Sequence, residues 1–402
     1  MQNTPGTPRL LRAINDRAAL ELLLEHGPLS RTQLGTLTGL SKPTASQLLA
    51  RLETVGLVVR VGLLEGNRGP SAQLYQVNPE AAHVAGLDVT PQRVDIAVAD
   101  ITGSVVAERV MPTPRRAAGR LVDRVRSAIE GASGQLGRTA ADLEHIVIGT
   151  PGAINPKTGQ LGFARHLPGW HAPGVLDQLR TNLGVPLDVE NDVNLAAIAE
   201  RWAGRARDSA NFVLLWVAEG VGLAIVLAGE LHRGASGGAG EVGYLPVPGH
   251  PLVRNLGKGA DGGFQATAGA SAVLRLARRH GIRSRSAADA LRRAAADATG
   301  PRGQFLQEFA TRLATGLAAV VSVLDPELIV LTGELGLAGG ETVRQFVAAE
   351  LQALSLPRPQ LELSSVTGNP VRAGAIHLAL AAARERVFSS TSGNREVREA
   401  PQ

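Results

Sequence analysis

Residues 27–60 constrain the chain more than any other segment, because their pattern predicts two short helices joined by a glycine turn and followed by a strand. Ser30 and Gln33 have the spacing of a capping box, in which each side chain bonds a helix-start N–H group that has no partner within the helix. Gly39 can adopt the left-handed backbone of a tight helix exit, and Ser41 is placed to cap the second helix. The segment therefore predicts a helix-turn-helix.

The second helix of this motif has one apolar and one polar face. Its apolar positions repeat at i, i+3, i+4 and i+7, and we expect them to be buried: they are Ala45, Leu48, Leu49 and Leu52. Short polar side chains near the start of such a helix suit base edges in the major groove, and basic residues on its borders suit phosphates. The predicted DNA-binding residues are Arg31, Ser41, Lys42, Thr44, Ser46, Gln47, Arg51 and Arg68. The alternative is an ordinary two-helix corner with a solvated polar face.

The surroundings of the motif favour DNA. Between residues 27 and 75 five basic residues stand against two acidic ones, as phosphate contacts require. Strand-like stretches at 57–61 and 72–77 flank a Gly-Asn-Arg-Gly-Pro tip, which predicts a wing whose Arg68 reaches the minor groove or a phosphate. A helix over 10–26 is expected to complete a three-helix core. Its predicted core residues are Leu11, Ile14, Ala18, Leu22 and Leu23.

Composition sets wider bounds. The chain has 402 residues, 44% of them hydrophobic and 19% charged, which is typical of two or three globular domains. It has no cysteine, and this excludes disulfides, thiolate zinc sites and a cysteine nucleophile. Neither an export signal nor a membrane span is recognisable, because the longest apolar stretch, 212–229, is interrupted by a glutamate and two glycines. We therefore expect a cytoplasmic protein.

Beyond residue 78 strands and helices alternate, which indicates an α/β body. Strands are expected at 84–89, 94–100, 101–108, 146–149, 186–190 and 328–333, and a hairpin over 212–231 bends at 219–222. Helices are expected at 119–136, 193–203, 340–354 and 373–386, with mostly helical sequence over 266–324.

Three places in this body combine a strand end with a carboxylate or a tight glycine turn: Asp88, Asn191-Asp192 and Gly220-Val-Gly222. Sugar kinases use such groups to hold metal-bound phosphate and to deprotonate a hydroxyl. Together with the order of elements, they resemble the ROK family of repressors, open reading frames and kinases. The resemblance covers about 9–386, and its strongest segments are 34–56, 68–70, 149–152, 189–194, 238–243, 325–327 and 374–375.

The resemblance implies a mainly α winged helix-turn-helix followed by a two-lobed α/β body of the actin/hexokinase-like (ribonuclease H-like) type. The expected domains are 1–78 for DNA binding, 79–388 for the ROK body and 389–402 for a disordered tail. In the body, lobe one is expected over 79–190 with the helix 373–386, and lobe two over 191–372.

The chain departs from the kinase pattern of the family at both phosphate loops and at the zinc site. Kinases carry a glycine pair and a threonine after the first strand's aspartate; here Pro91 removes a donor and fixes φ. Glu219 stands where the second loop offers a small hydroxyl residue, and its charge would repel phosphate. The zinc-linked histidine is replaced by Tyr244 and the loop 257–265 lacks cysteine, so we expect no metal and no cofactor.

By motif match, the effector-binding positions are Gly152, Asn191, Asp192, Glu241, Tyr244 and Gln265. Asp192 matches the catalytic base of the kinases and is interpreted as vestigial. The alternative is that Asn191 and Asp192 merely cap the following helix. Trp170 and His171 lie where relatives place a loop over the sugar.

The sequence therefore predicts a transcriptional regulator of the repressor type, a homodimer or tetramer that binds duplex operator DNA and is controlled by a sugar or sugar-phosphate effector, without kinase activity. Two alternatives stay open: an active ATP-dependent sugar kinase that carries a DNA-binding domain, and a DNA-binding dimer without an effector.

Overall fold

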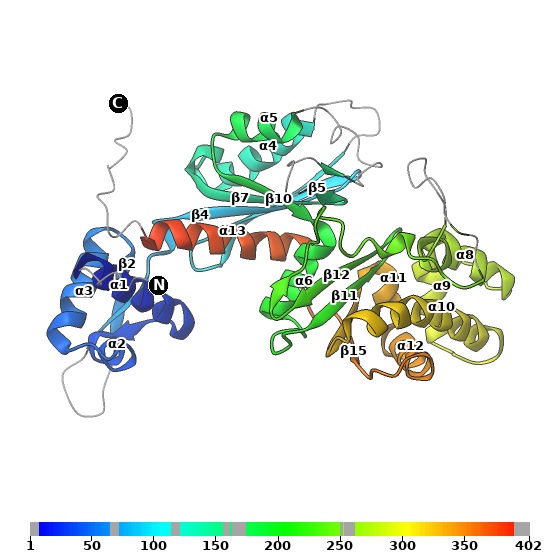
Figure 1. Ribbon diagram of the computed structural model, residues 1–402. Coiled ribbons are helices and arrows are strands. Elements are labelled where there is room, and N and C mark those ends of the chain that lie inside the picture. The colour runs from blue at the N-terminus through cyan, green and yellow to red at the C-terminus, as the bar shows by residue number, and fades with distance from the viewer. Residues whose placement is uncertain are drawn as a thin grey trace.

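The computed structural model describes residues 8–64, 72–113, 121–155, 161–162, 174–249, 252 and 262–389. Predictions for Arg68, Trp170, His171 and the tail fall outside these ranges. The described chain forms a winged helix beside a body built on two five-stranded sheets (Figure 1).

The winged helix has the predicted elements: α1 Pro8–His26, β1 Leu29–Ser30, α2 Arg31–Thr38, α3 Lys42–Thr54, β2 Val58–Leu64 and β3 Ala72–Val77. Its strands pair antiparallel in the order β1-β3-β2. The capping box of Ser30 and Gln33 is confirmed, as are the left-handed Gly39 and the N-cap Ser41. All four apolar positions predicted for α3 are buried.

The core predicted for α1 is partly wrong. Leu11 and Ile14 are 55% and 54% exposed, although Leu23 is buried as expected. The buried stripe of this helix is instead Asp16, Ala19, Leu20 and Leu23. It keeps the spacing i, i+3, i+4 and i+7, but a carboxylate heads it and hides it from a hydrophobicity pattern.

Lobe one carries the first large sheet, in the order β10-β7-β4-β5-β6. Its elements are η1 Pro79–Ala81, β4 His83–Val89, β5 Arg93–Asp100, β6 Val105–Pro112, α4 Leu121–Ser133, η2 Gly134–Leu136, η3 Ala140–Asp142, β7 Leu143–Thr150, α5 Val175–Leu183 and β10 Leu187–Asn191, with a small hairpin of β8 Ala153–Ile154 and β9 Leu161–Gly162. Strands β10, β7 and β4 run parallel, and β5 and β6 are antiparallel. Helices α4 and α5 lie on one face of the sheet and α13 (Pro370–Ser389) on the other (Figure 1).

The segment 101–108 is predicted to pair as a third strand across a Thr102-Gly103 turn. The turn is confirmed, and the strand itself begins later, at Val105. The Asp100 carboxylate accepts the backbone N–H groups of Thr102, Gly103 and Ser104 at 2.8, 3.1 and 3.2 Å. A carboxylate that bonds its own following backbone stabilises a turn over a strand.

Lobe two carries the second sheet, in the order β13-β12-β11-β14-β15. Its elements are α6 Asp192–Ala203, β11 Phe212–Val217, β12 Val221–Leu227, β13 Glu230–Leu231, η4 Val242–Tyr244, α7 Gln265–Ala268, α8 Ala270–Arg279, α9 Ala287–Ala295, α10 Gly300–Leu324, β14 Leu328–Thr332, α11 Gly333–Ala338, α12 Gly340–Leu354 and β15 Gln360–Leu363. The largest apolar cluster of the protein joins this sheet to α8, α9, α10 and α12.

Helix α13 lies unusually close to its neighbours at three glycines. A Cβ on Gly374 would lie 1.9 Å from the backbone oxygen of Leu195 in α6, and one on Gly86 in β4 would lie 2.6 Å from the backbone nitrogen of Ile376. A Cβ on Gly149 in β7 would lie 2.4 Å from Val371. The far end of α13 reaches α1, where Glu385 pairs with Arg17 at 2.7 Å. One helix therefore joins lobe one, α6 and the winged helix.

Candidate DNA-binding face and effector site

The second helix of the motif, α3, presents the predicted polar side chains outward. Lys42, Thr44 and Gln47 are exposed, and Ser46 is half-buried. Ser41 is held as the N-cap: its hydroxyl accepts the backbone N–H of Thr44 at 3.4 Å and lies 2.8 Å from the Thr44 hydroxyl. The start of α3 is thus a fixed, polar surface without acidic residues in its first turn, as entry into a groove requires.

Two arginines predicted to bind DNA have partners inside the domain instead. The Arg31 guanidinium donates to the Tyr75 hydroxyl at 3.0 and 2.6 Å and lies over that ring. Arg51 donates through Nε and Nη2 to the two carboxylate oxygens of Asp16, which is only 2% exposed. Arg51 therefore neutralises a buried carboxylate and joins α3 to α1. Its contact with DNA stays a prediction.

A closed turn at Thr90–Arg93 follows the first strand's aspartate, at the position where the kinase pattern predicts a phosphate loop. The Thr90 N–H donates to the Arg93 backbone oxygen at 2.9 Å, and the Arg93 N–H donates to the Thr90 hydroxyl at 3.1 Å. Pro91 has no N–H to donate. Of the four backbone nitrogens in this turn, two are bonded internally and one lacks hydrogen, so the turn offers no cradle of N–H groups to a phosphate.

Asp88, the strand-end carboxylate before this turn, also has a hydrogen-bond partner within the protein. The Asn369 side-chain amide donates to Asp88 at 2.8 Å and to Asp95 at 3.0 Å, and Arg372 pairs with Asp95 at 2.8 Å. Burial raises the pKa of the Asp88 carboxyl, and the Asn369 bond opposes that rise. These groups bind the start of α13 to lobe one.

Asn191 joins two of the predicted effector positions. Its Oδ1 accepts the backbone N–H of Asn194 at 3.1 Å, which makes it the N-cap of α6, and its Nδ2 donates to the Gly152 backbone oxygen at 3.0 Å. Glu190 supports this corner by accepting from the Asn194 amide at 2.9 Å and from Arg233 at 2.7 Å. The alternative that Asn191 caps the following helix is therefore confirmed. The same side chain also holds Gly152 beside it.

Asp192 lies among other carboxylates. Its Oδ1 accepts the Val193 backbone N–H at 2.8 Å. Burial, and then the negative charge of Asp88, raise the pKa of Asp192 to about 7, and the charge of Glu241 contributes in the same direction. Burial also raises the pKa of Glu241. Asp88 and Glu241 therefore lie near enough to Asp192 for their charges to raise its pKa.

Gln265, another predicted effector position, is bonded to the β11–β12 turn. Its Oε1 accepts the Val221 backbone N–H at 2.7 Å, and its Nε2 donates to the Glu219 backbone oxygen at 2.9 Å. Both ends of the amide therefore hold this turn, and a contact of Gln265 with a sugar stays a prediction. Glu219 itself is exposed at this turn.

No group of three or more histidine or acidic residues in the described ranges could hold a metal ion. Tyr244, at the position of the zinc-linked histidine, is half-buried at the end of η4. Within the same ranges, no helix is both long and apolar enough to cross a membrane.

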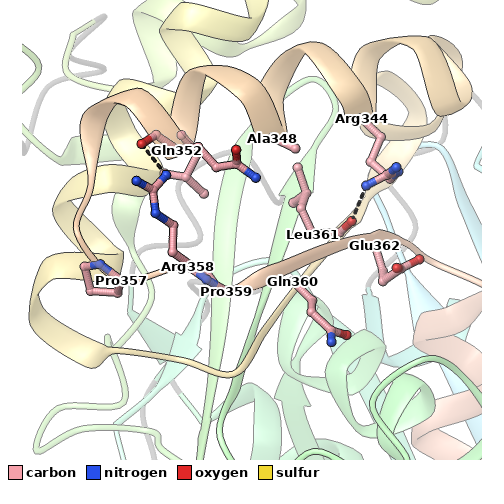
Figure 2. Close-up of a pocket in the computed structure, with 10 residues that line it drawn as sticks. Arg344, Ala348, Gln352, Pro357, Arg358, Pro359, Gln360, Leu361 and Glu362 are labelled. Atoms are coloured by element: carbon pink, nitrogen blue, oxygen red, sulfur yellow. Dashed lines mark hydrogen bonds between the residues drawn. The ribbon is translucent and has the colours of Figure 1, made fainter.

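Figure 2 shows a pocket of about 300 Å³ between α12 and β15, which none of the predicted site residues lines. Its two arginines are engaged by the protein: Arg344 donates to the Leu361 backbone oxygen at 2.9 Å, and Arg358 donates to the backbone oxygen of Gln352. The pocket therefore offers no guanidinium that is not already bonded, and we do not assign a ligand to it.

The raised pKa of Asp192 gives a stability prediction. Its pKa rises from 3.8 in an unfolded chain to about 7 in the fold, so the wild type should lose stability as the pH rises from about 4 through about 7. Asp192→Asn keeps an acceptor for Val193 and carries no charge. We expect it to match the wild type at pH 4 and to be more stable by at least about 1 kcal/mol at pH 8.

Calorimetric melting between pH 4 and 8 checks this expectation, with the exposed Asp208→Asn as control. The control should follow the wild-type profile. Parallel profiles for Asp192→Asn and the wild type would show that Asp192 ionises freely in the fold.

Comparisons with known proteins cover both parts of the chain. Residues 84–381 match the model of the ROK family, and residues 13–66 match that of the MarR family. The xylose repressor of Caldicellulosiruptor bescii is 23% identical over 393 residues, which cover 93% of this chain and 97% of that protein. The DNA-binding transcriptional dual regulator NagC of Escherichia coli K12 is 24% identical over 341 residues, 82% of each chain.

Among solved structures, a ROK family transcriptional regulator, a homologue of the E. coli MLC protein, superposes with a TM-score of 0.71 at 20% identity. The match covers 94% of this chain and 99% of that one. This likeness shows that the whole fold, from winged helix to two-lobed body, is shared.

Proposed function

The chain belongs to the ROK family and is a DNA-binding regulator of its repressor type, and we propose that its kinase-like body binds a sugar effector without phosphorylating it. The proposed effector positions are Gly152, Asn191, Asp192, Glu241 and Tyr244. The relatives named xylose repressor and, in Escherichia coli O6:H1, N-acetylglucosamine repressor support a regulator whose signal is a sugar or a sugar derivative.

The closed turn at Thr90–Arg93 is the observation that carries the non-enzymatic part of this proposal. Phosphoryl transfer depends on backbone donors and cations that hold the phosphates while charge develops. In this turn the backbone N–H groups of Thr90 and Arg93 already donate to Arg93 and Thr90, and Asp88 is bonded to Asn369. Sugar binding needs only polar groups that pair with hydroxyls, and these remain at Asp192 and Glu241.

We expect no ADP release when the protein is mixed with ATP and any hexose or pentose. In the same samples a cognate sugar should raise the melting temperature, because specific binding to the folded state stabilises it, whereas ATP should not. Glu241→Gln should reduce the sugar-induced shift. ATP turnover that disappears in Asp192→Asn would establish a kinase instead, and no shift with any sugar or sugar phosphate would favour the effector-independent alternative.

For the DNA-binding face, we propose that Thr44, Ser46 and Gln47 read base edges while Lys42 and the wing contact the backbone. Ser41 positions these groups as the N-cap of α3. We further propose that the protein is a two-fold homodimer, so that two copies of α3 meet half-sites a whole number of DNA turns apart. We also propose the domain limits 1–78 for DNA binding and 79–388 for the body.

Gln47→Ala is expected to weaken operator binding by about 1–3 kcal/mol and to leave binding to random duplex DNA nearly unchanged, because Gln47 is exposed on the face that would enter the groove. Thr54→Ala, at the far end of α3, is the control and should change neither affinity. Fluorescence anisotropy with operator and random duplexes measures both. Wild-type operator affinity for Gln47→Ala would assign sequence reading to another element, the wing first.

A further inference from the structure

The α8–α9 hairpin, residues 270–297, is a strongly basic part of lobe two. We call it the arginine hairpin. It carries seven arginines and two aspartates, an excess equal to the formal net charge of +5 of the whole protein. All seven are exposed: Arg275, Arg278, Arg279, Arg283, Arg285, Arg292 and Arg293. Positive charge is therefore found in lobe two as well as in the winged helix.

The arginine hairpin is fixed in place by packing on the core of lobe two and by a capped turn. Its apolar sides are buried in the core of lobe two through residues such as Val273, Leu276 and Leu291. Ser286 caps α9 by accepting the Asp289 backbone N–H at 3.1 Å, and the Ser284 hydroxyl bonds the Asp289 carboxylate at 2.7 Å. The guanidiniums consequently project from rigid helices and a braced turn.

Six of the seven arginines divide into two groups, and the seventh, Arg275, donates to the Ala266 backbone oxygen at 3.5 Å. Arg279 pairs with Glu308 at 2.6 Å and Arg293 with Asp289 at 2.9 Å, so these two brace the hairpin. Four others make no side-chain hydrogen bond or ion pair with any residue in the part of the chain that the structure describes: Arg278, Arg283, Arg285 and Arg292. Their charges are available to a polyanion.

The chemistry of the arginine hairpin selects the kind of polyanion. Residues 270–297 include no phenylalanine, tyrosine or tryptophan, so they lack the stacking platforms that single-stranded nucleic acids use. Their apolar side chains face the core, so no apolar group is offered to a membrane. Exposed guanidiniums without base-reading partners are suited to duplex phosphates, which bind arginine without regard to sequence.

We propose that the arginine hairpin is a second DNA contact, which binds the phosphates of duplex DNA without reading sequence. It is separate from the recognition surface, because α8 and α9 lie at the opposite end of the molecule from α3 (Figure 1). DNA held there is either the flank of the bound operator or another duplex segment. The inference rests on the DNA-binding function of the chain and not on an effector.

The test compares two full-length variants that each lose four positive charges. The hairpin variant carries R278Q, R283Q, R285Q and R292Q. The matched control carries R126Q, R180Q, R205Q and R207Q, which are exposed arginines outside the hairpin. Affinities for a long random duplex and for a minimal operator duplex are measured over a range of salt concentrations, and circular dichroism melts establish that each variant folds.

Each phosphate contact adds about 0.9 to the slope of log K against log salt concentration. We expect the hairpin variant to lose about 3 units of slope on the long duplex relative to the wild type, and the control variant less than 1. On the minimal operator both variants should bind like the wild type, because this duplex engages only the winged helix.

Two results would overturn the proposal: equal losses of slope in the two variants, or no loss of slope in the hairpin variant. If the wild type itself did not bind the operator duplex, the assignment of the winged helix to DNA binding would be wrong instead. The two failures are therefore distinguishable.

Discussion

Arg51→Ala is expected to destabilise the winged helix by about 3 kcal/mol and to abolish operator binding, although Arg51 need not touch DNA. Removing the guanidinium leaves the carboxylate of Asp16 without its partner at a site that is 2% exposed, and an uncompensated buried charge is costly. Hydrogen exchange of the α1 and α3 amides measures the loss locally, and anisotropy measures binding. Arg12→Ala, which removes an exposed arginine of α1, is the control and should have little effect.

A double variant separates folding from contact. Asp16→Leu with Arg51→Met replaces the ion pair by apolar groups, a change that is often neutral or stabilising. We expect it to restore both folding and operator binding. If folding returns while operator and random-DNA binding stay weak, Arg51 contacts phosphate directly and the original interpretation of the sequence is right.

Gly374→Ala is expected to destabilise the body by about 3 kcal/mol, because its new Cβ would lie 1.9 Å from the Leu195 backbone oxygen and α13 must move to relieve the overlap. Since α13 also holds α1 through Glu385 and Arg17, operator affinity should fall as well. Denaturant unfolding and anisotropy measure the two effects.

Gly134→Ala is the matched control for this substitution, because no atom lies within 4 Å of the Cβ it would add and the residue has no positive φ. It should change stability by less than about 1 kcal/mol, in the stabilising direction. If the two substitutions had the same effect, the close packing of α13 on α6 would not contribute to stability.

The features that sequence analysis found most reliably are those fixed by neighbours along the chain. The capping box and the glycine exit of α2 and the N-cap of α3 depend on residues a few positions apart, and α2 and α3 begin where their caps predict. The N-cap role of Asn191 could be identified for the same reason. The effector positions Gly152 and Glu241 come from family motifs and stay a prediction.

The errors arise where a distant residue decides the role of a side chain. Asp16 can be buried because it pairs with Arg51. The two residues are 35 positions apart in the sequence, and nothing near Asp16 signals this pairing. Gln265 is used by a turn 44 positions upstream. The short strand β15 was missed because its four residues follow two prolines and acquire strand geometry from pairing with β14.

Because α13 follows every element of lobe two along the chain, lobe one is completed only after lobe two has been synthesised. Asp88 in β4 and Asn369 at the start of α13 are bonded across 281 positions, and the face of the sheet that α13 covers stays open until residues 370–389 have left the ribosome. Contacts of such long range make folding slow and leave apolar surface uncovered meanwhile. A truncated chain that ends before α13 would therefore be a substrate for chaperones and proteases rather than a smaller active regulator.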